Sequence, residues 1–126
     1  MRGKIESYRD LVVWQRAMDL VVDCYRLSRA FPDSERFGLT SQIQRAAVSI
    51  PANIAEGRGR RTTKEFIRHL SIAYGSLCEI ETHLLIAIRL EFINKAQAEP
   101  LLAEAGAISR MLNGLQASLR RKLTPD

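Results

Sequence analysis

A chain of 126 residues with 46% apolar residues is long enough for one domain with a hydrophobic core, which excludes intrinsic disorder. Its four prolines, seven glycines and 6% aromatic residues argue against a β-sandwich, which needs many turns and β-branched runs. The net charge of +5 comes mainly from arginine, which binds phosphate well and makes a polyanion a candidate partner. A genome that encodes arginine where others encode lysine is the alternative explanation of this bias.

The N-terminal and apolar segments predict a soluble, cytoplasmic protein. The N-terminus lacks the apolar region of a signal peptide, and the most apolar run, residues 84–88, is far shorter than the roughly 20 residues of a membrane span. Cys24 and Cys78 lie within helical patterns and outside any Cys-x-x-Cys motif. We therefore expect both to be buried, reduced thiols.

Two apolar stripes with helical spacing predict a first helix over residues 8–30. One stripe contains Leu11, Trp14, Met18, Val21 and Tyr25, and the other contains Val13, Ala17, Leu20, Cys24 and Leu27. The residue before a proline disfavours the α conformation, so Pro32 should end this helix by Phe31.

A second helix is predicted from residue 35 or 39 to Glu56. Its stripe contains Leu39, Ile43, Ala46 or Ala47, Ile50 and Ile54. Pro51 lacks an amide N–H and clashes with the carbonyl of Ala47, so we expect a kink there. Gly57 is typical of the residue that ends a helix.

A third helix is predicted to begin after Thr62, which has Glu65 at the spacing of a capping box, and to end near residues 90–92. Its main stripe contains Phe66, Leu70, Ala73, Leu77, Ile80, Leu84 and Ile88, and a second contains Ile67, Tyr74, Cys78 and Leu85. A fourth helix begins at Asn94 as N-cap, or at Glu99 if Pro100 ends a separate turn.

Four long helices with short loops predict an all-α, antiparallel up-down-up-down four-helix bundle, a single domain over residues 1–126. The first and third helices each carry more apolar surface than one bundle core needs. A monomer would expose it as an unusually large patch, so we expect self-association through these two helices. The alternative is that the extra residues lie on the flank of the core.

No pattern in the sequence predicts an enzyme, a metal site or a cofactor site. The Glu-x-x-His pairs of di-iron bundles are missing, and Glu79 and His83 are interpreted as a solvated pair one turn apart. No Gly-x-Ser-x-Gly motif occurs, and His69 is interpreted as a surface residue. Gly57 and Gly59 lack the preceding strand of a dinucleotide-binding motif.

The basic residues are predicted to gather at one end of the bundle, where the expected topology brings the N-terminus, the second loop and the C-terminus together. They are Arg2, Lys4, Arg9, Arg58, Arg60, Arg61, Lys64, Arg68, Arg120, Arg121 and Lys122. From these we predict nucleic-acid binding, chiefly through phosphate contacts, by Arg58, Arg60, Arg61, Lys64, Arg68, Arg120, Arg121 and Lys122. Solubility and pairing with helix dipoles are the alternative role.

Three segments carry a family resemblance: residues 11–15 (LVVWQ), residues 42–57 (QIQRAAVSIPANIAEG) and residues 73–81 (AYGSLCEIE). The chain resembles the four-helix bundle proteins encoded in intervening sequences of bacterial large-subunit ribosomal RNA genes. The resemblance implies a homopentamer without an established activity. The chain is also similar to the accessory variability protein of diversity-generating retroelements, which binds nucleic acid and its reverse transcriptase through a basic surface.

The second of these segments also suggests a structural hypothesis. Arg45, Asn53 and Glu56 flank Pro51, and we expect them to satisfy the backbone groups that the proline frees and to tie the helix to its neighbours. Together with Pro51 and Gly57 they are the predicted structural residues. The sequence thus favours a non-enzymatic oligomer that binds RNA or DNA, and it leaves open a scaffold whose partner is another protein.

Overall fold

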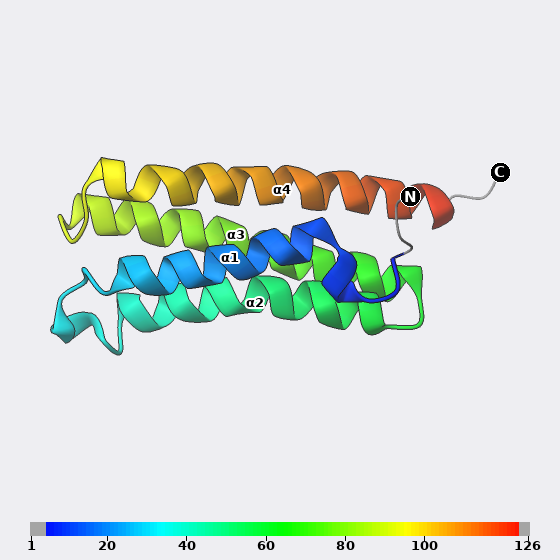
Figure 1. Ribbon diagram of the computed structural model, residues 1–126, viewed down its shortest axis with the longest axis horizontal. Coiled ribbons are helices and arrows are strands. Elements are labelled where there is room, and N and C mark those ends of the chain that lie inside the picture. The colour runs from blue at the N-terminus through cyan, green and yellow to red at the C-terminus, as the bar shows by residue number, and fades with distance from the viewer. Residues whose placement is uncertain (1–4, 124–126) are drawn as a thin grey trace.

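The computed structural model describes residues 5–123, most of which form four long helices. These are α1 (Val12–Ser28), α2 (Leu39–Gly59), α3 (Thr63–Arg89) and α4 (Lys95–Leu123), with short 3-10 helices η1 (Tyr8–Asp10) and η2 (Asp33–Glu35). No strand occurs within the described range, which confirms the all-α prediction. In Figure 1 the α1–α2 and α3–α4 loops lie at one end of the molecule and the α2–α3 loop at the other.

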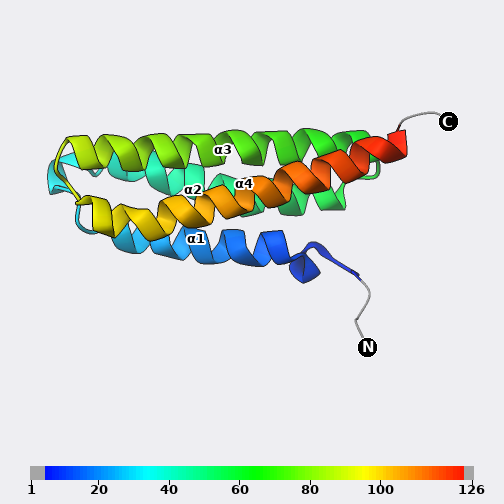
Figure 2. The ribbon, with the colours of Figure 1, turned by 90° about the horizontal axis from the view of Figure 1, so that it is seen from above.

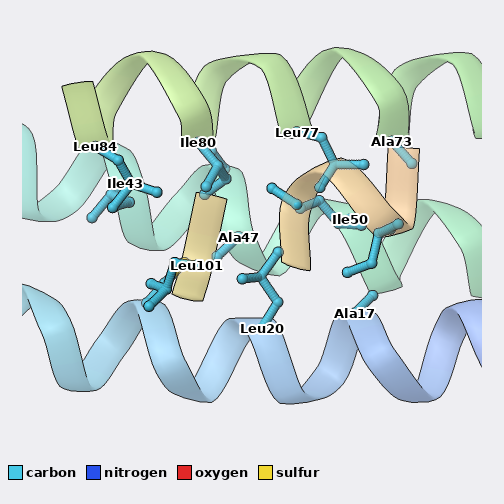
Figure 3. Close-up of a cluster of buried hydrophobic side chains, with 14 of the residues drawn as sticks. Ala17, Leu20, Ile43, Ala47, Ile50, Ala73, Leu77, Ile80, Leu84 and Leu101 are labelled. Atoms are coloured by element: carbon cyan, nitrogen blue, oxygen red, sulfur yellow. The ribbon is translucent and has the colours of Figure 1, made fainter. Parts of the chain in front are cut away.

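The four helices pack as expected for a bundle. Helix α2 contacts α3 most extensively, and α1 and α3 each pack on α2 and α4 without packing on each other. They therefore occupy diagonal corners. Side chains from different helices interdigitate in the core, among them Leu20 of α1, Ile50 of α2 and Leu77 of α3 (Figure 3). Leu20, Ile50 and Leu77 are all completely buried, so this layer holds the helices together by excluding water.

The side chains of α1 that face the core belong to the second of its two predicted apolar stripes. Ala17, Leu20 and Cys24 are completely buried, whereas Met18 and Tyr25 are exposed. The two stripes have the same helical period, so only the positions of α2 and α4 decide which of them faces inward. Helix α1 also begins later than predicted, at Val12, because Ser7 and Asp10 form a separate capping box around η1.

The predicted helix starts of α3 and α4 are confirmed at the level of side chains. The hydroxyl of Thr62 accepts a hydrogen bond from the amide of Glu65 at 3.1 Å. Asn94 and Gln97 cap each other, with the Asn94 side chain accepting from the Gln97 amide at 2.8 Å and the Gln97 side chain from the Asn94 amide at 2.9 Å. Pro100 therefore lies within α4 rather than before it.

Helix α3 ends in a Schellman turn that places a non-glycine residue in the left-handed region. Glu91 has a φ of 62°, while the amide of Phe92 donates to the carbonyl of Ala87 at 2.9 Å. This conformation destabilises an L-residue by roughly 1–2 kcal/mol, whereas glycine adopts it with almost no strain.

We expect Glu91→Gly to raise the free energy of unfolding by about 1 kcal/mol, measured by urea denaturation, because it removes this strain. The matched control is Glu99→Gly in the first turns of α4, where the backbone is helical. That change should lower stability by about 1 kcal/mol. Two changes of the same sign would contradict this account of the turn.

A bidentate ion pair joins α1 to α4. The Arg16 guanidinium donates to both carboxylate oxygens of Glu104, at 2.8 Å from Nε and 2.6 Å from Nη2. This hydrogen bonding holds the pKa of Glu104 below its ordinary value of 4.5. Burial of the carboxyl group acts in the opposite direction but has a smaller effect. Because the carboxyl group is more acidic in the folded state, its contribution is present above that value and is lost as the pH falls through the folded pKa.

We therefore expect Glu104→Gln to cost about 0.5–1 kcal/mol of stability at neutral pH and almost nothing near pH 2, since the pair is partly exposed. Urea denaturation of both proteins at several pH values would measure the difference. A difference that stays constant with pH would show that packing, not the charge, explains the loss.

Three predictions of whether a side chain is buried or exposed were wrong. His69 and His83 are only 4% and 8% exposed and lie on the side of α3 that faces its neighbours, rather than on the surface. Cys24 is buried as expected, and burial raises the pKa of its thiol to about 12, but Cys78 is exposed.

None of the described helices is long and apolar enough to cross a membrane.

Candidate nucleic-acid interface

The structure brings the predicted basic residues of α2, α3 and α4 to one end of the molecule. Figure 1 and Figure 2 both place the α2–α3 loop beside the C-terminal end of α4. We call this region the basic end. It contains Arg58, Arg60, Arg61, Lys64, Arg68, Arg120, Arg121 and Lys122, of which all but the half-buried Arg58 are exposed. Arg2 and Lys4 lie outside the described residues.

Two of these basic residues are paired with acidic residues three or four positions away in the sequence. Arg60 contacts Glu56 at 2.6 Å, and this hydrogen bond is the main reason why the pKa of Glu56 is lowered. Arg68 lies 3.7 Å from Glu65. Within residues 5–123, no ion pair engages Arg58, Arg61, Lys64, Arg121 or Lys122. The basic end therefore carries a surplus of uncompensated positive charge, which attracts polyanions.

Helix dipoles divide the basic end into two parts. The N-terminus of α3 lies here, and its partial positive charge adds to that of the adjacent arginines. The C-terminus of α4 carries partial negative charge, which Arg120, Arg121 and Lys122 offset. The three residues of α4 thus also stabilise their helix, whereas the α2–α3 loop supplies the stronger positive field for a phosphate.

Gly57 fixes the base of this loop by letting α2 and α3 approach closely. A Cβ at this position would lie 2.7 Å from Cβ of His69 and 3.0 Å from Cδ1 of Phe66. Gly57 is helical, and α2 continues to Gly59. The prediction that Gly57 ends the helix was therefore wrong. Its role is to make room for the neighbouring helix. The sequence alone could not show this, because glycine is also typical of the residue that ends a helix.

A line of polar side chains joins α2 to α3 above Gly57, and we call it the α2–α3 seam. It consists of Ser49, Asn53, His69 and Ser76. The Ser76 hydroxyl donates to that of Ser49 at 2.9 Å, and Nδ1 of His69 lies 3.0 Å from Oδ1 of Asn53. Buried polar groups that are paired across two helices fix their register, so the seam holds the loop in one position relative to the bundle.

The predicted structural residues of α2 divide into two groups. Asn53 donates to the carbonyl of Ser49 within α2 at 2.9 Å, while its Oδ1 lies 3.0 Å from Nδ1 of His69 on α3. Glu56 lies 3.8 Å from Nε2 of His69, so Asn53 and Glu56 both tie α2 to α3. Neither contacts the carbonyl that Pro51 frees. Arg45 is exposed and forms no hydrogen bond or ion pair with any described residue. Pro51 itself is buried inside α2.

Residues 5–123 contain no group of three or more His, Cys, Asp and Glu side chains that could hold a metal ion. The arrangement at the basic end consists of cations on a rigid helical frame, without a nucleophile and base in contact. Such a surface is suited to binding phosphate groups, for which arginine supplies a planar, bidentate donor.

Comparisons with known proteins agree with this all-helical architecture. Residues 9–114 match the family model described as "23S rRNA-intervening sequence protein". The chain is also similar to the crystal structure of a protein of unknown function from the S23 ribosomal protein family of Bacteroides thetaiotaomicron, with a TM-score of 0.75 and 28% sequence identity. That match covers 83% of this chain and 98% of the other. A search of curated proteins gave no significant match.

Proposed function

Because the chain belongs to the family of 23S rRNA-intervening sequence proteins, for which neither comparison names an activity, we propose a function from its surface. We propose that it is a non-enzymatic, cytoplasmic, oligomeric bundle protein that binds RNA or DNA through the basic end. The observation that carries the proposal is the uncompensated charge of Arg58, Arg61 and Lys64, which lie in the α2–α3 loop or next to it, beside the basic C-terminus of α4.

The proposal includes an antiparallel up-down-up-down order of the helices, with α2 bent at Pro51. The alternating ends at which the loops lie in Figure 1 support this order. The bend is supported by the missing amide of Pro51 in the interior of α2. This order of helices brings the basic residues of α2, α3 and α4 onto the same end.

Exposed apolar side chains on α1 and α3 support the oligomer. Met18, Val22 and Tyr25 are exposed on α1, and Tyr74 and Leu85 are exposed on α3. Because these helices occupy diagonal corners, the two surfaces lie on different sides of the subunit. A contact between one surface and the other surface of the next copy is heterologous, and repeated contacts of this kind form a ring when the rotation between neighbours closes. We propose a homopentamer, as the family resemblance implies.

A ring also explains how a modest charge becomes a binding surface. We propose that the bundles run parallel to the axis of the ring. All subunits of a cyclic oligomer have the same orientation relative to the axis, so their basic ends then lie on one face. Each phosphate contact contributes little alone, but many contacts release many counterions and bind a polyanion firmly. The opposite end would then face away from the nucleic acid.

The test combines mass with binding. Light scattering should give a multimer that binds both RNA and DNA, with an affinity that falls steeply between about 50 and 200 mM salt. Leu85→Glu, at a position that is 52% exposed in the subunit, should dissociate the multimer, and Ala117→Glu on the exposed side of α4 should not. A monomeric wild-type protein would contradict the oligomer, and binding that does not depend on salt would contradict the phosphate contacts.

A scaffold that binds another protein is the second candidate. Phe37, in the α1–α2 loop at the opposite end, is 88% exposed, and exposed aromatic side chains are frequent anchors of protein interfaces. A multimer that ignores every nucleic acid but loses a protein partner on Phe37→Ala would favour this candidate.

A further inference from the structure

A groove on the outer surface between α2 and α3 has the character of a small binding site. It has a volume of about 230 Å³. The residues that line it are Gln42, Arg45, Ala46, Ser49, Ser76, Glu79 and His83. It lies several turns from the basic end, beyond Ser49 and Ser76 of the α2–α3 seam. Neither the oligomer nor the nucleic-acid surface proposed above uses it.

The groove exists because small side chains face each other where α2 and α3 meet. Ala46, Ser49 and Ser76 fill less space than the aliphatic residues of the core. The two serine hydroxyls bond to each other at 2.9 Å, so the floor of the groove is polar and fixed. A polar floor between two helices favours a ligand that forms hydrogen bonds over an apolar one.

His83 supplies a polar atom without a partner. Its side chain lines the groove and is 8% exposed, and its Nδ1 forms no hydrogen bond with any described residue. Burial is the main cause that lowers the pKa of His83, with Glu79 acting in the opposite direction, so the ring is neutral near pH 7. Buried polar atoms in native proteins nearly always have a partner. Because Nδ1 is shielded by the surrounding protein, the ring must turn toward the groove for a bound molecule to supply that partner.

The rim of the groove carries two opposite charges that are not paired with each other. Arg45 and Glu79 both line it, and within residues 5–123 neither forms an ion pair. A guanidinium favours a carboxylate or phosphate, and a carboxylate favours an ammonium group. A polyanion would be repelled by Glu79, whereas a small molecule that carries both charges would satisfy the whole rim.

From these observations we propose that the groove binds a small zwitterion of the amino-acid class. Its carboxylate lies at Arg45 and the serine hydroxyls, its ammonium group lies at Glu79, and His83 completes the hydrogen bonds on the floor. Such a ligand would also give Arg45 the charged partner that it lacks among the described residues. The site therefore recognises a free amino acid by its backbone groups, in a volume that admits a small side chain.

NMR of the two histidine rings tests this site in the full-length protein, because His69 and His83 are the only histidines of the chain. Alanine, used as the probe at up to about 10 mM, should shift the His83 resonances saturably and leave those of His69 unchanged. Acetate and methylamine, which each carry one of the two charges, should bind at least about tenfold more weakly. Unmoved His83 resonances, or acetate binding as tightly as alanine, would overturn the proposal.

Two exposed positions allow the charges to be tested without disturbing the core. Arg45→Gln should weaken the binding of alanine by at least about tenfold, and Glu79→Gln should abolish the preference for alanine over acetate. Arg89→Gln, on α3 outside the groove, is the control and should bind like wild type. A circular dichroism spectrum of each variant establishes that it is folded, so that unchanged affinity in Arg45→Gln counts against the site.

Discussion

Changing Arg58, Arg60 and Arg61 to Ala is expected to reduce nucleic-acid affinity on the order of 10–100-fold at about 50 mM salt. Arg58 and Arg61 carry uncompensated charge, and the loss of Arg60 removes the cation that pairs with Glu56 beside the loop. If each arginine contacts one phosphate, the slope of log K against log salt for duplex DNA should fall by about 2.7. The loss should be similar for all sequences, because phosphate contacts carry no sequence information.

The control for this experiment removes the same charge from the other end of the molecule. Arg26, Arg29 and Arg36 lie near the α1–α2 loop and are exposed. Changing these three residues to Ala gives the same net charge as the first variant, so a smaller loss of affinity would show that position, rather than total charge, decides binding. Equal losses in the two variants would refute a binding surface at the basic end.

Gly57→Ala is expected to lower the free energy of unfolding by about 1–3 kcal/mol, a large effect for a single methyl group. The added Cβ would meet Cβ of His69 and Cδ1 of Phe66 at 2.7 and 3.0 Å, and both atoms belong to the packed N-terminal part of α3. Cβ of His69 is tied to the helix backbone, so relief requires α3 to move away from α2. Urea denaturation with a circular dichroism signal would measure the cost.

Gly59 provides the matched control two residues later in the same helix. A Cβ there has no neighbour within 4 Å, so Gly59→Ala should be neutral or stabilise the protein by up to about 1 kcal/mol. If Gly57→Ala behaves in the same way, the close contact between the two helices is wrong. A loss of nucleic-acid binding in Gly57→Ala alone would further show that the position of α3 relative to α2 shapes the loop.

The division of this chain into four long helices could be predicted from its sequence because it rests on periodicity and local capping. The main stripe of α3, for example, contains Leu70, Leu77 and Leu84, and all three are completely buried. The caps at Thr62 and Asn94 depend only on residues three positions apart, so local sequence suffices to find them. These features need no knowledge of what lies across the core.

The errors occur where the neighbouring helix decides the outcome. Both stripes of α1 have the period of a helix, and Gly57 is equally suited to a helix end and to a close contact. His69 was placed on the surface because charged residues precede it in sequence, but its hydrogen bond to Asn53 comes from another helix. The periodicity of α3 offered one usable signal, since His69 is adjacent to Leu70 and four residues before Ala73 on the core side.

The two cysteines differ in exposure, so the reactivity of the exposed thiol can report on the assembly of subunits. The Cys24 thiol is buried and protonated, so it is a poor nucleophile, whereas the Cys78 thiol lies on the exposed side of α3, between Tyr74 and Leu85 in sequence. A maleimide dye should therefore label each subunit once, at a known position. Slower labelling at high protein concentration would show that α3 becomes covered by the next copy as subunits associate. This experiment needs no change to the sequence.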